Sequence, residues 1–179
     1  MSKDKIITAT HSLNEFFFHS LSKKNKEVPC PLPEEFLFYS SLVLERYAMS
    51  ENFFALKEGK INEKIFGLKF LQSQKKENSE KVNDLKDVGD TLLVQLGLFS
   101  DSVKNKLTNK NYYVAIAQNA YHQLDGLEFQ FYDIPNFYRL FASSFERTLV
   151  LLEAMSADFL EGSDHQFLLD LESENKKAI

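Results

Sequence analysis

Residues 79–125 read SEKVNDLKDVGDTLLVQLGLFSDSVKNKLTNKNYYVAIAQNAYHQLD, and the rest of the chain is organised around this stretch. Its first half carries apolar residues three or four positions apart, at Val82, Leu85, Val88, Leu92, Leu96 and Phe99. This spacing places one apolar stripe along one side of a helix. Gly89 and Gly97 are separated by about two helical turns, so they share a face that another backbone can approach closely. The stretch therefore predicts a long helix packed tightly against a neighbour.

The second half of the stretch carries its own helical pattern. Apolar residues recur at Tyr112, Ile116, Ala120 and Leu124, after a polar break from Ser100 to Asn111. Two periodic runs joined by such a break predict a helical hairpin.

Short motifs follow one another in this stretch: Gly89-Asp90, Gly97-Leu98-Phe99, Asp101-Ser102, Tyr112-Tyr113 and Ala120-Tyr121. Their order resembles an uncharacterised all-helical family of predatory and soil-dwelling Gram-negative bacteria. The resemblance is confined to this stretch. It implies a bacterial helical protein and assigns no functional residue.

The composition fits one folded domain. The chain has 179 residues, of which 44% are hydrophobic and 26% charged, values typical of globular proteins. We expect a single all-α domain over residues 1–179, built from about six to eight helices, with residues 1–10 and 173–179 as frayed tails.

The net charge indicates which partners the protein is not expected to bind, and the cysteine count indicates its compartment. A net charge of -5 opposes binding to nucleic acid or to anionic lipid. No apolar run reaches the ~18 residues of a membrane span, and the N-terminus lacks the pattern of a signal peptide. Cys30 is the only cysteine, which agrees with a reducing compartment. The sequence thus predicts a cytoplasmic protein without a membrane span.

The remaining helices are expected on both sides of the central stretch. A short helix with Thr10 or Ser12 as its cap precedes the rigid segment Pro29–Pro33, and Glu34 and Glu35 fall in the first turn of the next helix. Residues 53–66 fit a short helix and a turn, or a hairpin.

Ser79 is the expected cap at the start of the central helix, and Gly126 is the expected left-handed cap at the end of the helix that follows it.

The C-terminal half is expected to hold a long helix. Residues 127–131 alternate briefly like a strand. A continuous helix then runs from Pro135 through Met155, followed by a short terminal helix with a capping box at Ser163–Gln166.

Motifs for nucleotide or zinc chemistry are absent from the sequence, so an enzyme is disfavoured and no cofactor or metal is expected. The strongest carboxylate group is Asp84, Asp87 and Asp90, which fall on one slowly rotating helical face. A metal ion or a basic partner could offset their repulsion, although a solvated face is the more usual explanation. Cys30-Pro31 is too short a motif to predict a haem site.

Two functions remain open. The leading one is a non-catalytic interaction or regulatory protein that associates with itself or with a protein partner. Its candidate contact residues are Phe16, Phe17, Phe18, Tyr112, Tyr113 and Tyr121. The alternative is a ligand-binding sensor with an aromatic-lined cavity, whose polar groups would come from Asp90, Tyr113, Tyr121 and His122.

Overall fold

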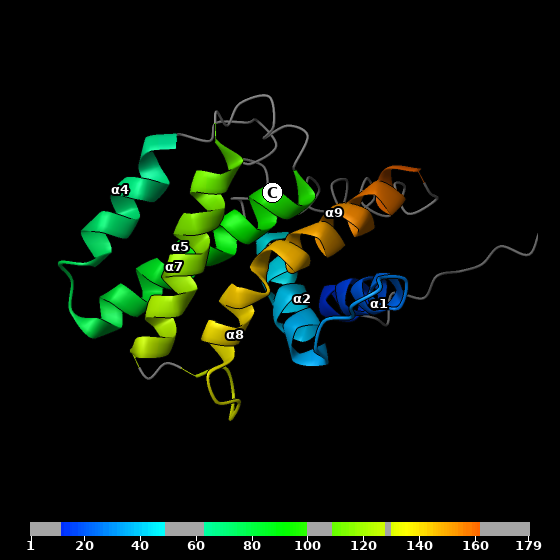
Figure 1. Ribbon diagram of the computed structural model, residues 1–179, viewed down its shortest axis with the longest axis horizontal. Coiled ribbons are helices and arrows are strands. Elements are labelled where there is room, and N and C mark those ends of the chain that lie inside the picture. Colours follow the sequence, from blue (N-terminus) through cyan, green and yellow to red (C-terminus); the bar gives the residue numbers. More distant parts are fainter. Residues whose placement is uncertain (1–11, 49–62, 100–108, 128–129, 162–179) are drawn as a thin grey trace, which may run out of the picture.

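The protein is all-helical in the residues that its computed structural model describes, namely 12–48, 63–99, 109–127 and 130–161 (Figure 1). The helices in these ranges are α1 (Leu13–Asn25), α2 (Glu34–Ala48), α4 (Glu63–Ser73), α5 (Asn78–Leu98), α7 (Lys110–Gly126), α8 (Phe137–Ser143) and α9 (Phe145–Glu161). They share one hydrophobic core, so the prediction of a compact all-α domain is confirmed.

Helix α5 is the centre of the fold. It packs against α7, as the predicted hairpin requires, and also against α9, α4 and α2. Helix α1 packs against α2 and α9, and α8 packs against α7. In Figure 1, α4 and α1 lie at opposite ends of the long axis, with α5 and α7 beside α4. The apolar stripe of α5 is buried because helices cover it on several sides.

The two glycines of α5 admit side chains rather than a backbone. A Cβ atom on Gly89 would lie 2.8 Å from Cζ of Tyr121 on α7. A Cβ atom on Gly97 would lie 2.7 Å from Cδ1 of Leu152 on α9. The space over the two glycines is therefore filled by side chains of two different helices, and not by the backbone of one neighbour as predicted.

Helix starts follow the expected chemistry in part. The Ser12 hydroxyl accepts a bond of 3.2 Å from the Glu15 amide and caps α1. The Asn109 side chain caps α7 in the same way, through the Tyr112 amide at 3.2 Å. The predicted cap at Ser79 is wrong, because α5 begins at Asn78 after an extended Glu77.

The C-terminal half differs from the prediction at three points. The helix predicted from Pro135 begins at Phe137, and it is broken at Ser144 into α8 and α9. Gly126 is the last residue of α7 and not a left-handed cap, and the cap position is Leu127 with φ of -94°.

The brief alternation over residues 127–131 does not produce a strand among the described residues; Phe131 forms only an isolated bridge with Ile134. Predictions for residues 1–10, 53–62, 128–129, 163–166 and 173–179 lie outside the described ranges.

Candidate functional site

Asp90 is a fully buried carboxylate on α5, and side chains from three helices surround it. Its Oδ1 atom accepts hydrogen bonds from the hydroxyls of Tyr39 at 2.5 Å and Tyr121 at 2.8 Å. Its Oδ2 atom accepts a bond of 2.5 Å from Nη2 of Arg46 and lies 3.6 Å from Nζ of Lys86. We call these five residues the Asp90 cluster. It joins α2, α5 and α7 in the middle of the fold.

Gly89 and Asp90 act as a pair toward α7. Because Gly89 has no side chain, the ring of Tyr121 lies directly against α5. The next residue, Asp90, then receives the hydroxyl of the same tyrosine. The Gly-Asp step thus provides both the space for the ring and the acceptor for its polar end, which a buried tyrosine needs.

Aromatic rings close the cluster from the apolar side. The Tyr39 ring contacts those of Tyr121, Tyr138 and Phe141 at centroid distances of 6.1, 5.7 and 5.0 Å. Burial, followed by the Asp90 charge, holds the pKa of Tyr39 and the pKa of Tyr121 well above the usual value. Both hydroxyls therefore stay protonated and donate to the carboxylate.

Lys86 connects the cluster to the aromatic rings. Its Nζ atom donates to the Tyr39 hydroxyl at 3.2 Å and lies 4.7 Å from the centroid of the same ring. It also lies 5.8 Å from the centroid of the Tyr138 ring. These distances are within the range of cation–π attraction. Asp90, Tyr39 and Tyr138 therefore hold the ammonium group from several sides.

An open pocket of about 500 Å³ lies beside the Asp90 cluster. Arg46 and Tyr47 of α2, Lys69 of α4 and four residues of α5 line it, the latter being Asn83, Asp84, Lys86 and Asp87. Two ion pairs stand at the pocket: Lys69 with Asp87, and Asp84 with Lys76 at 2.7 Å. The side chains that line this pocket are therefore mostly charged, and Tyr47 is the aromatic residue among them.

The three carboxylates on the α5 face do not converge on one point. Asp84, Asp87 and Asp90 each pair with cations, drawn from the α4–α5 connection, from α4, and from α2 and α5. Among the described residues, no group of three or more His, Cys, Asp or Glu side chains is placed to hold a metal ion. Lysine and arginine thus offset the repulsion within the molecule.

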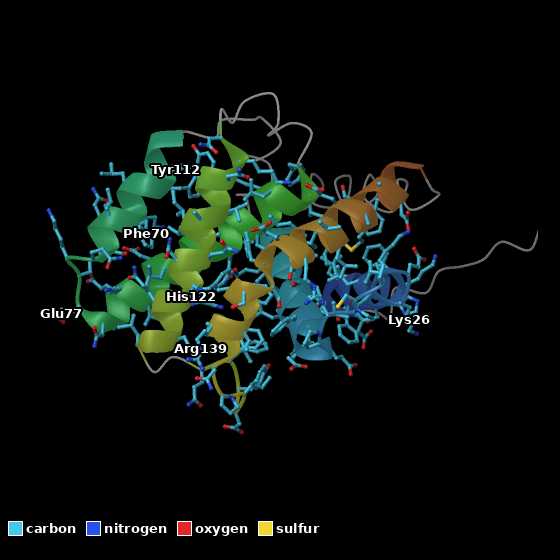
Figure 2. The ribbon with its side chains drawn as sticks, in the orientation of Figure 1. Lys26, Phe70, Glu77, Tyr112, His122 and Arg139 are labelled. Atoms are coloured by element: carbon cyan, nitrogen blue, oxygen red, sulfur yellow. The ribbon has the colours of Figure 1, made fainter. Side chains whose placement is uncertain are left out.

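Of the candidate ligand-binding residues, the structure brings Asp90 and Tyr121 together by a hydrogen bond. Tyr113 is buried in the core, with its ring 5.2 Å from that of Tyr112. His122 is exposed on α7 (Figure 2). The predicted group of four is therefore divided between the Asp90 cluster, the core and the surface.

The candidate contact residues are divided in the same way. Phe17, Tyr113 and Tyr121 belong to the core, so they offer no accessible surface to a partner. Phe16 and Phe18 are half-buried and pack against the core. Tyr112 is the exposed member of the set.

Sequence reasoning missed Arg46, Tyr39 and Lys86 as parts of one site. Arg46 lies two turns after Tyr39, and Lys86 lies one turn before Asp90, so each pair shares a helical face. Both spacings can be seen in the sequence. Nothing in the sequence, however, shows that α2 and α5 pack with these two faces together.

Helices long and apolar enough to cross a membrane do not occur in the described part of the chain. Comparison with protein-family models, with curated proteins and with solved structures gives no match, so no relative assigns a role to the Asp90 cluster.

Proposed function

We propose that the protein is a non-catalytic, cytoplasmic bacterial interaction or regulatory protein that associates with a second copy of itself through the outer side of α4. One observation carries the proposal: Leu68 and Leu71 on this side are 54% and 64% exposed. Large apolar side chains that stand together on a helix surface are typical of a contact site.

Tyr112 extends this exposed surface from α4 onto α7. It is 50% exposed, and its hydroxyl oxygen would lie 2.6 Å from a Cβ atom on Gly67, next to Leu68. We call Leu68, Leu71 and Tyr112 the α4 face. Tyrosine suits such a face because its ring supplies contact area while its hydroxyl tolerates water when unbound.

Helix α4 is apolar on both sides. Phe66 and Phe70 pack inward against the core, while Leu68 and Leu71 point outward. A helix at the surface of a monomer is usually polar on its outer side, and a helix that is apolar all round is usually covered. The outer side of α4 therefore has the character of a helix with a second neighbour.

A second copy fits this face electrostatically. Lys69 is neutralised by Asp87, and Lys76 by Asp84, within the same molecule. A two-fold axis between Leu68 and Leu71 would place each leucine against the other leucine of the second copy. Such a contact buries the apolar residues against each other. Lys69 and Lys76 bring no unpaired charge to it, because each already forms an ion pair within its own copy.

Light scattering over a range of protein concentrations tests the proposal. We expect the wild type to show a concentration-dependent dimer that Leu71→Glu abolishes. Leu140→Glu is the matched control, because Leu140 is similarly exposed but lies on α8. It should leave the dimer intact. A wild type that stays monomeric throughout, or a Leu71→Glu protein that associates like the wild type, would contradict the proposal.

A search for protein partners should use Tyr112→Ala rather than Tyr113→Ala. Tyr113 is buried, so its replacement would disturb the fold and the partner contact alike. Tyr112 is exposed, and its truncation changes the surface with little effect on the core. Loss of a partner with Tyr112→Ala, and its retention with Leu140→Glu, would assign the contact to the α4 face.

A further inference from the structure

The pocket beside the Asp90 cluster carries an excess of positive charge at its inner wall. Arg46 and Lys86 are both paired with the single carboxylate of Asp90. Tyr39 and Tyr121, the other members of the cluster, are neutral because their pKa values are raised. Two cations therefore share one anion, which leaves about one unit of positive charge at this wall.

The outer part of the pocket does not cancel this excess. Asp87 is paired with Lys69, and Asp84 with Lys76 at 2.7 Å, so each ion pair is neutral as a unit. Asn83 is an exposed, uncharged lining residue. The unbalanced charge thus belongs to Arg46 and Lys86.

Arg46 retains hydrogen-bond donors that the described residues do not use. Its Nη2 atom binds Asp90, while the side chain is 49% exposed and lines the pocket. A guanidinium group has five N–H donors in a planar fork, and this fork matches the two oxygens of a carboxylate or phosphate. No described residue occupies the donors at Nε and Nη1, so an anion in the pocket could accept from them.

The Asp90 cluster fixes the position of these cations before any ligand arrives. Asp90 is immobilised by the hydroxyls of Tyr39 and Tyr121, and it anchors Arg46 on one side and Lys86 on the other. A preorganised pair of cations loses little side-chain entropy on binding. The buried carboxylate then has a role beyond packing, because it aligns the groups that face the pocket.

We propose that this pocket binds a small organic or inorganic oxyanion, held by Arg46 and Lys86 through a carboxylate or phosphate group. The volume of about 500 Å³ suits a small molecule and is within the usual range of ligand sites. Asp84 and Asp87 at the pocket disfavour a polyanion such as a nucleic acid backbone. Its binding groups, Arg46 and Lys86, lie on α2 and α5 and not on the α4 face, although Lys69 of α4 also lines the pocket.

Nuclear magnetic resonance titration of the full chain tests the site with two probes, inorganic phosphate and succinate. We expect at least one probe to cause saturable shifts of the backbone amides of Arg46, Asn83 and Lys86. Sodium chloride at the same ionic strength is the control for general screening. Binding of phosphate alone or of succinate alone would identify the group that the site prefers.

Variants separate the pocket from nonspecific charge effects. Arg46→Lys keeps the charge but loses the planar fork, and should weaken binding by about tenfold or more. Asn83→Glu adds a negative charge to the pocket and leaves the Asp90 cluster intact, so it should weaken binding even if Arg46→Lys fails to fold. Arg139→Gln removes an exposed arginine on α8 and should leave the affinity unchanged (Figure 2).

The inference is overturned if neither probe gives saturable shifts at these amides, or if chloride reproduces them. It is equally overturned if Asn83→Glu binds as tightly as the wild type, or if Arg139→Gln weakens binding as much as the pocket variants do.

Discussion

Replacing Asp90 by Asn tests whether the buried carboxylate stabilises the fold. Asparagine has nearly the same shape, so the change removes the charge without creating a cavity. Asp90 accepts three short hydrogen bonds in the native structure, from Tyr39, Tyr121 and Arg46. The replacement changes every one of them.

The expected loss of unfolding free energy depends on which hydrogen bonds the asparagine amide can still accept. Its carbonyl oxygen retains the tyrosine bonds as neutral ones, and the change from a charge-assisted to a neutral bond costs about 1 kcal/mol each. Its NH₂ group faces the Arg46 donor, so that bond, worth about 1.5–3 kcal/mol, is lost. Arg46 is half-exposed and regains water, and the amide avoids the cost of burying a charge. We therefore expect a net loss of about 3 kcal/mol.

Urea unfolding followed by far-ultraviolet circular dichroism measures this loss. A change of about 3 kcal/mol, with an m-value of about 2 kcal/mol per molar urea, lowers the midpoint by about 1.5 M. Asp87→Asn is the matched control, because Asp87 lies one turn earlier on α5 and is half-exposed in its pair with Lys69. It should cost no more than about 1 kcal/mol.

A double-mutant cycle with Tyr121→Phe then isolates the hydrogen bond to Asp90. Tyr121→Phe alone should cost about 1.5 kcal/mol, and markedly less when Asp90 is already Asn. The reasoning is refuted if Asp90→Asn costs as little as Asp87→Asn, or if the two cluster mutations are additive.

Two further predictions concern packing and pH. Gly89→Ala should destabilise the protein by about 1–3 kcal/mol in the same urea assay despite the better helix propensity of alanine, because the new methyl group meets the ring of Tyr121 at 2.8 Å. Gly126→Ala, where nothing lies within 4 Å, should be neutral or stabilising, and equal effects at both positions would remove the steric explanation. Stability should also fall as the pH rises above about 10, since an unfolded tyrosine releases its proton there while the buried ones retain theirs, with a slope of about 1.4 kcal/mol per pH unit for each tyrosine involved. The tyrosines with raised pKa are Tyr39, Tyr47, Tyr121 and Tyr138. Their ionisation, followed by ultraviolet absorbance, should coincide with unfolding. Ionisation in the folded state with the ordinary tyrosine pKa of about 10 would contradict their burial.

The sequence by itself determined the helical class and the central hairpin. Leu85, Val88, Leu92 and Leu96 recur at helical spacing, and all of them are buried in α5. This prediction succeeds because the period of the apolar residues directly records which side of a helix faces the core. The start of α1 was readable for a similar reason, since the cap at Ser12 is a local contact over three residues.

The sequence also marked part of the candidate site. Gly89-Asp90 and Tyr121 belong to the short motifs of residues 79–125, and the structure joins them through the space over Gly89 and the hydrogen bond to Asp90. Asp90 is a candidate in the sequence because it is one of three carboxylates spaced along one helical face.

Only the tertiary structure decided which partner that would be. Tyr39 and Arg46 are separated from Asp90 by 51 and 44 residues, and they meet it because α2 packs across α5. The packing of the other helices buries Tyr113 and Phe17 while leaving Leu68 and Leu71 exposed. Helical periodicity says that an aromatic or aliphatic residue lies on an apolar side, but a helix such as α4 is apolar on more than one side. Which side becomes core and which becomes surface depends on where its neighbours lie, and that is a property of the assembled fold.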